Sequence, residues 1–171
     1  MDDKRRHLLA ILEPVIAEAR RAPWGAALER GLNEICPAEG PRFAALEALC
    51  AEGIAEGWMG LEGEGPRLGG RVVEPLAETG RLSVDVVQLV DFTGPHHRHP
   101  GGEICAVMPE REEGRFDGRA RGWAVYPPGS DHWPAATGGR VRILFLLPEG
   151  AIDYSDAAAS LASGTRGGAP D

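Results

Sequence analysis

The stretch GPHHRHPGGE, residues 94–103, holds three of the five histidines in a chain of 171 residues and ends in a carboxylate. On a β-strand, side chains two residues apart point to the same face, so His97 and His99 would place both imidazoles in one space. The sequence PGG then turns the chain, and Glu103 would open the next strand beside them. Two imidazoles and one carboxylate on adjoining strands suit a divalent first-row metal ion, so the spacing predicts a metal site.

A fourth ligand is expected elsewhere in the chain, and His132 is the candidate. It lies in YPPGSDHW, residues 126–133, and is the only other histidine in the β-rich part of the sequence. The alternative is that residues 94–103 form a solvated polar loop that binds no ion. Spacing alone leaves both interpretations open, although H-x-H-x-x-x-E places three ligands by strand geometry.

The sequence around this stretch has the composition and spacing typical of short β-strands. Segments rich in Val, some of them alternating, are separated by Gly and Pro, which mark turns. The expected strands lie within residues 81–92, 103–109, 114–118, 121–129 and 139–150. Several short strands with frequent turns predict an all-β sandwich or barrel, so we expect a mainly β fold.

Residues 4–60 have a different residue pattern, with apolar residues at three- and four-residue spacing and abundant Ala and Glu. This pattern predicts helices that each have one apolar face. A Gly-rich stretch, residues 56–70, marks the change from the helical pattern to the strand pattern. We therefore expect a helical N-terminal segment over 1–65, a barrel over 66–154 and a small, polar C-terminal tail over 155–171 that is partly disordered. The helices would cover one mouth of the barrel or build a homodimer interface.

Charge and composition exclude several classes of partner. The formal net charge of −8 and the scattered Lys and Arg residues argue against nucleic acid and against anionic membranes, since both require basic patches. No apolar run approaches the roughly 20 residues that a transmembrane helix needs. Cys36, Cys50 and Cys105 are odd in number and widely spaced, which favours reduced thiols in a cytoplasmic protein.

Two motifs in this chain resemble those of the cupins. HHRHPGGE (96–103) is similar to the first cupin motif, H-x-H followed after three or four residues by E, and PPGSDH (127–132) is similar to the second, P-x-G-x-x-H. The resemblance implies a small antiparallel jelly-roll barrel with one divalent transition metal inside it, one of Mn, Fe, Co, Ni or Zn. The metal ligands that it implies are His97, His99, Glu103 and His132. The chain departs from the second motif at Ala136, where an Asn is common, which weakens the transfer of any one cupin's substrate.

A narrower resemblance extends over most of the β-rich part. The chain is similar to the 4-hydroxylaminobenzoate lyases in the blocks SVDVV (83–87), GPHH-H with GEI and VMP (94–109), FDG (116–118), GW-VY-PGS-H (122–132) and LLPEG-I (146–152). These are small bacterial proteins with a helical N-terminal part and a single cupin barrel. The resemblance implies conversion of 4-hydroxylaminobenzoate, a small aromatic substrate, and water to protocatechuate and ammonia. The alternatives are a cupin dioxygenase acting on a small aromatic and a non-enzymatic cupin that binds a metal or a small ligand.

Other residues near the motifs have candidate roles. Glu103 is a candidate catalytic residue as well as a ligand, and His96 is a candidate for proton transfer unless it is an exterior strand or loop residue. Arg142 lies in an apolar strand, where a buried guanidinium needs a partner, either a substrate carboxylate or an internal Asp or Glu. Asp91 shares strand parity with His97, so it could orient a ligand histidine from outside the metal site.

The aromatic residues Trp123, Tyr126 and Trp133 flank the second motif, where they would be core, pocket wall or substrate contacts. Cys105 would share the inward face of its strand, as a small buried hydrophobe rather than a ligand. Arg98 alternates with two of the candidate ligands, so it should point outward as a solvated or interface charge.

Overall fold

The computed structural model describes residues 1–154, and the predicted disorder of the tail 155–171 lies outside the described residues. The N-terminal part of the described chain forms the helices α1 (Asp3–Arg21), α2 (Ala26–Ile35) and α3 (Pro41–Ala55). They confirm the prediction that this part is helical. None of the described helices is both long and apolar enough to span a membrane.

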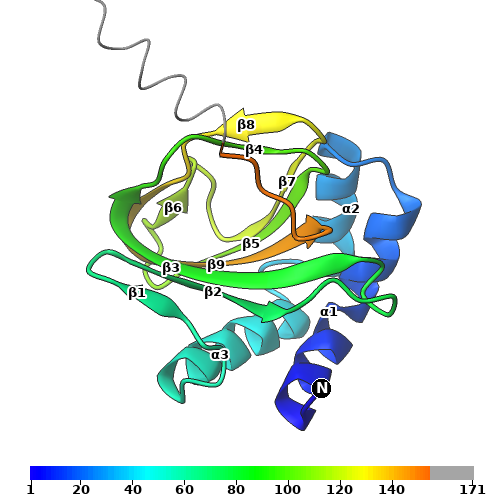
Figure 1. Ribbon diagram of the computed structural model, residues 1–171, viewed down its shortest axis with the longest axis horizontal. Coiled ribbons are helices and arrows are strands. Elements are labelled where there is room, and N and C mark those ends of the chain that lie inside the picture. Colours follow the sequence, from blue (N-terminus) through cyan, green and yellow to red (C-terminus); the bar gives the residue numbers. More distant parts are fainter. Residues whose placement is uncertain (155–171) are drawn as a thin grey trace, which may run out of the picture.

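The rest of the described chain forms two antiparallel sheets. The strands are β1 (Glu62–Glu64), β2 (Arg67–Val73), β3 (Leu82–Thr93), β4 (His97–His99), β5 (Glu103–Pro109), β6 (Arg115–Phe116), β7 (Gly122–Tyr126), β8 (Ser130–His132) and β9 (Ala135–Pro148). The larger sheet has the order β1-β2-β3-β9-β5-β7 with β6 beside β9, and β4 pairs with β8 in the second sheet. Figure 1 shows β4 and β8 facing β3 and β9 across the interior. This arrangement confirms a mainly β, cupin-like barrel with N-terminal helices.

The strands β1 and β2 begin inside the Gly-rich stretch 56–70, which we interpreted as the boundary between the helical and the β parts. At Gly70 on β2, an added Cβ would meet the carbonyl oxygen of Gly60 at 2.8 Å, so two backbone segments approach too closely here for a side chain. The formation of β2 depends on its pairing with β3 more than on local residue preference. The helices therefore end at residue 55 and the first strand begins at residue 62, within the predicted helical segment 1–65.

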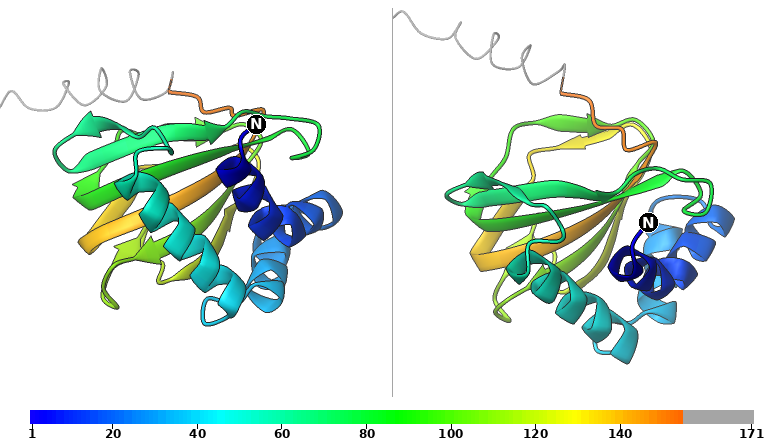
Figure 2. Two further views of the ribbon diagram at one scale, coloured as in Figure 1. Left: turned by 90° about the horizontal axis from the view of Figure 1, so that it is seen from below. Right: turned by 60° about the horizontal axis from the view of Figure 1, so that its bottom comes forward.

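Both faces of β5 are buried, which explains its continuous apolar run. Alternate residues of a strand face opposite sides. Ile104, Ala106 and Met108 pack with the helices in one core, whereas Cys105 and Val107 belong to a second core inside the barrel. Figure 2 shows the helices lying across the outer face of the larger sheet. Within this chain, the helices thus cover the outside of the barrel rather than its mouth.

Trp123 of β7 joins the helices to the sheet. Its ring meets that of Phe43 on α3 edge to face, with centroids 5.8 Å apart. Its indole N–H donates to the carbonyl of Cys36 at 2.9 Å, and its backbone N–H donates to the side chain of Asn33 at 3.1 Å. Of its predicted roles, Trp123 is therefore a core residue at the helix–sheet interface.

Candidate metal centre

The strands β4 and β8 and the start of β5 bring the four predicted ligands together. The pairing of β4 with β8 sets His97 opposite His132, and His99 stands two residues further along β4 on the same face. Glu103 opens β5 after the intervening turn. The four residues each offer one ligand atom, and these atoms lie within 4.8 Å of one another. His97, His99 and Glu103 are buried and His132 is half-buried, so the sequence-predicted set forms one inward-facing cluster.

Three donor–donor distances in the cluster match those between ligands of one ion. His132 Nε2 lies 3.1 Å from His99 Nε2 and 3.2 Å from His97 Nε2. His99 Nε2 lies 3.2 Å from Glu103 Oε2. Nitrogen ligands at about 2.1 Å from a common ion, at angles between a right angle and the tetrahedral angle, are roughly 3.0–3.4 Å apart. The residues present therefore fit a divalent ion.

Hydrogen bonds on the outer side of two imidazoles turn their lone pairs inward. His132 Nδ1 donates to Asp117 Oδ2 at 2.6 Å and His97 Nδ1 donates to the carbonyl of Pro95 at 3.1 Å, because both partners can only accept. In the neutral imidazoles the two Nε2 atoms therefore carry the lone pairs, and these face each other across 3.2 Å. Two facing lone pairs repel unless a cation lies between them, so the outer hydrogen bonds favour metal binding.

Burial keeps the imidazoles in the form that binds metal. Desolvation, followed by the neighbouring imidazoles, lowers the pKa of His97 to about 4 and that of His99 to about 3. Both are therefore neutral near pH 7, as a ligating imidazole must be. Burial also raises the pKa of Glu103 to about 7, although the thiol of Cys105 donates to its Oε1 at 3.0 Å. A bound cation would stabilise the Glu103 carboxylate in its ionised form.

Asp117 is the residue of this site that sequence reasoning missed. Besides His132 Nδ1, it accepts from the hydroxyl of Tyr126 at 2.7 Å and from the backbone N–H of Ala135 at 2.7 Å. Its φ of 49° lies in the left-handed region, which Asp tolerates better than most residues. The triplet FDG is a turn signal in the sequence, but nothing in its spacing from the second motif indicates the contact with His132.

The prediction that Asp91 orients a ligand histidine is wrong. A β-bulge between Val90 and Phe92 interrupts the alternation of β3, and Asp91 itself has a φ of 43°. Its exposed carboxylate accepts from the backbone N–H of Gly139 at 2.9 Å instead. Strand parity cannot be carried through a bulge, because the extra residue changes which face the following side chains occupy.

Arg142 lies on the outer face of β9, away from the barrel interior. It pairs in register with Met108, which packs with the helices, so both side chains share that face. Its guanidinium lies 4.0 Å from the carboxylate of Glu110. Of the two alternatives for Arg142, the structure supports the internal ion pair and not a substrate carboxylate.

His96 is buried just before β4. The side chains that it contacts are exposed residues and not the four candidate ligands. Its Nε2 lies 2.7 Å from Asp131 Oδ2, and its ring lies 4.3 Å from that of Trp133, which is exposed. Arg98, which alternates with His97 and His99 on β4, is exposed as its position on the strand predicted. Within the described residues, His96 does not line the pocket beside the ligands, and a role in proton transfer stays a prediction.

A pocket of about 370 Å³ lies inside the barrel, with His97, Glu103 and His132 in its wall. Much of the remaining wall is apolar. It includes Val87, Leu89, Phe92, Phe116 and Phe145. An apolar pocket of this size with a few convergent polar groups suits one small aromatic molecule.

Comparison with known proteins identifies relatives of this chain. A family model described as 4-hydroxylaminobenzoate lyase matches residues 10–154. A 4-hydroxylaminobenzoate lyase of Pseudomonas putida is 31% identical over 169 residues, which cover 89% of this chain and 96% of that protein. A protein of the same name from a Nocardioides species is 31% identical over 150 residues, which cover 82% of this chain and 89% of that protein.

Solved structures are similar at a greater distance. The DMSP lyase DddQ of Ruegeria pomeroyi is 17% identical, with a TM-score of 0.45 over 92% of this chain and 98% of that chain. An RmlC-like cupin protein of Ralstonia eutropha is 11% identical, with a TM-score of 0.39 over 59% of this chain and 74% of that chain. These structures are too remote to bear on function, whereas the family model spans well over half of the chain. The chain therefore belongs to the 4-hydroxylaminobenzoate lyase family.

Proposed function

We propose that this lyase is metal-dependent and converts 4-hydroxylaminobenzoate and water to protocatechuate and ammonia. The convergence of His97, His99, Glu103 and His132 on an apolar pocket carries the proposal. The reaction balances without an oxidant. The N–O bond, the ring C–N bond and one ring C–H bond break, two ring C–O bonds form, and nitrogen leaves as ammonia. The two electrons that reduce nitrogen come from the ring carbon that exchanges hydrogen for hydroxyl.

The residues of the site would divide the work between them. Held by the four donors, a divalent ion would supply Lewis acidity at the hydroxylamine end of the substrate. The side chains of Val87, Phe116 and Phe145 would hold the ring and keep bulk water away from it. Asp117 would keep His132 in its ligating tautomer and orientation.

The donor set does not select one metal, since imidazole and carboxylate ligands suit Mn, Fe, Co, Ni and Zn alike. We also propose that the protein is a cytoplasmic homodimer. The buried, free thiols of Cys36, Cys50 and Cys105 support a reducing compartment. Light scattering of the purified protein would test the dimer.

The decisive experiment is conversion of 4-hydroxylaminobenzoate by metal-loaded protein under strict anaerobiosis, in water enriched with oxygen-18. We expect ammonia and a catechol with label in a ring hydroxyl, because water supplies oxygen to the ring. Stripping the metal with a chelator should stop turnover, and adding it back should restore turnover. Strict dependence on dissolved oxygen would favour a cupin dioxygenase, and tight binding without turnover would favour a binding module.

Glu103→Gln gives a second test, because it removes one negative ligand while keeping the shape of the side chain. We expect turnover to fall far more than the affinity for 4-hydroxybenzoate, an unreactive analogue, since the apolar pocket is unchanged. Equal losses of turnover and of analogue affinity would contradict a role for Glu103 in the chemistry.

A further inference from the structure

Two arginines of β2, Arg67 and Arg71, line the same pocket as the metal ligands. They share one face of the strand with Gly69, which lies between them. In the register with β3, Arg67 stands opposite Leu89 and Arg71 opposite Asp85. The two cations therefore lie four residues apart on the same face of β2, on one wall of the pocket.

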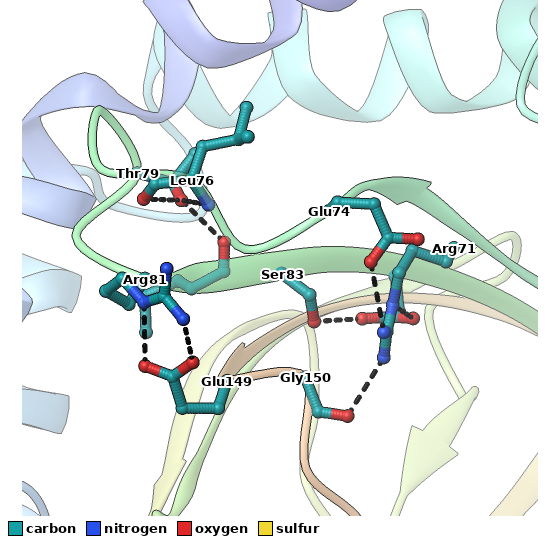
Figure 3. Close-up of polar contacts among 10 residues, drawn as sticks. Arg71, Glu74, Leu76, Thr79, Arg81, Ser83, Glu149 and Gly150 are labelled. Carbon is teal, nitrogen blue, oxygen red and sulfur yellow. Dashed lines mark hydrogen bonds and ion pairs between the residues drawn. The ribbon is translucent and has the colours of Figure 1, made fainter.

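Arg71 is fully engaged by neighbouring groups. Its Nε donates to Asp85 Oδ1 at 3.0 Å, and its Nη2 donates to the carbonyl of Gly150 at 2.9 Å. Its Nη1 lies 3.4 Å from Glu74 Oε2. Figure 3 shows Arg71 between Glu74 and Gly150, with these contacts dashed. The charge of Arg71 is thus already balanced within the protein.

Arg67 is placed differently. Among the described residues, its guanidinium makes no hydrogen bond and no ion pair. An added Cβ at Gly69 would lie 3.5 Å from Arg67 Nη2, so the guanidinium folds back along β2 over a position that has no side chain. It also lies near Tyr154. Burial raises the pKa of Tyr154, and the positive charge of Arg67 acts against this rise. Arg67 is therefore an exposed residue that lines the pocket, and no described protein group holds its guanidinium.

The acidic groups around the pocket are committed elsewhere. Asp85 is bonded to Arg71 and Ser83, Glu103 belongs to the metal ligands, and Asp117 accepts from His132. An Arg guanidinium matches the geometry of a carboxylate with two parallel hydrogen bonds. Arg67 is therefore available to an anion that arrives with the ligand.

We propose that Arg67 binds the carboxylate of the aromatic substrate and makes this pocket select carboxylated rings. The inference rests on the proposed function, since 4-hydroxylaminobenzoate supplies the carboxylate. That group lies para to the reacting nitrogen, so Arg67 is a binding and specificity-determining residue that does not touch the reacting atoms. The sequence analysis considered Arg142 for binding the substrate carboxylate, and we assign this role to Arg67 instead.

The test uses two unreactive ligands that differ only at this group, 4-hydroxybenzoate and 4-hydroxybenzamide. Their affinities for the metal-loaded protein are measured by calorimetry. We expect the unmodified protein to prefer the carboxylate by about 10- to 100-fold, as a charged hydrogen-bonded pair would give. Arg67→Met should abolish this preference and leave binding of the amide unchanged, and Arg67→Lys should keep part of it.

Arg140→Met is the matched control. Arg140 is a β9 arginine that lies outside the pocket lining and 3.3 Å from Glu110, so its loss changes the net charge equally without touching the pocket. It should bind both ligands as the unmodified protein does. The inference is overturned if Arg67→Met keeps the preference for the carboxylate, if it loses affinity for both ligands equally, or if the unmodified protein shows no preference.

The same measurements separate this inference from the proposed reaction. A protein that prefers the carboxylate through Arg67 but converts no aryl hydroxylamine would refute the lyase reaction and leave the carboxylate site standing. A protein that converts 4-hydroxylaminobenzoate while Arg67→Met retains its KM would refute the carboxylate site alone.

Discussion

Asp117 Oδ2 lies 2.6 Å from His132 Nδ1, and this contact decides which nitrogen of His132 faces the pocket. A carboxylate can only accept here, so Nδ1 carries the proton and Nε2 presents its lone pair to the other ligands. The residue that provides the carboxylate comes from the turn after β6, outside both histidine motifs. The orientation of a candidate ligand therefore depends on a residue that is not itself a ligand.

Asp117→Asn should weaken metal binding by about 10- to 100-fold, because the amide no longer enforces the tautomer of His132. Competition with a chelator of known affinity measures the change. Asp91→Asn is the matched control, since Asp91 also has a positive φ and also accepts from a backbone N–H, but at an exposed site. Equal metal affinity in the two variants would contradict the role of Asp117.

His99→Ala and His132→Ala should each remove most of the bound metal from a protein that remains folded. The apolar strands carry the core, so circular dichroism should change little while elemental analysis shows the loss. His7→Ala, in α1 and remote from the motif residues, should retain a full equivalent of metal. Full metal content in both pocket variants would refute the ligand assignment.

The metal-free protein should lose stability as the pH falls from about 6.5 to about 4. The pKa values of His97 and His99 are lowered from 6.5 to about 4 and about 3, so in this window the unfolded chain binds protons that the folded chain does not. Glu103 acts in the opposite direction. Its pKa is raised from 4.5 to about 7, so its contribution is present at low pH and is lost as the pH rises through this range. The two histidines outweigh the single carboxyl.

Glu103→Gln isolates the contribution of that carboxyl. Without it, the fall in melting temperature of the metal-free protein between pH 6.5 and 4.5 should become steeper, because the opposing contribution of Glu103 is removed and that of His97 and His99 remains. Thermal unfolding followed by circular dichroism at several pH values measures both slopes. An unchanged slope would show that Glu103 has an ordinary pKa.

Phe43→Ala should destabilise the fold by about 3–5 kcal/mol, because it empties a fully buried position against Trp123. Ile35→Ala, at a side chain that is 45% exposed, should cost no more than about 0.5 kcal/mol. Denaturant titration measures both changes. Metal stoichiometry should be unaffected in either variant, since both residues belong to the helices and not to the strands that carry the candidate ligands. A loss of metal from Phe43→Ala would contradict this separation.

The sequence by itself determined the helical and β parts and the four clustered donors. The pattern H-x-H-x-x-x-E acts over a few residues, where strand alternation and one turn decide which side chains share a face. The run EICAVMP was predicted as a strand over 103–109 and forms β5 with the same bounds. Such features are local, so they can be read without knowing which strands pair.

Only the tertiary structure decided the roles of Asp117, Asp91 and Arg67. Asp117 reaches His132 because a turn and a second strand fold back on each other, and no spacing rule encodes that approach. The bulge beside Asp91 reverses a parity that the sequence would carry straight through. Arg67 faces the pocket because Gly-rich β2 pairs with β3 in one register, and a strand without strong local preference takes both its existence and its face from its neighbour.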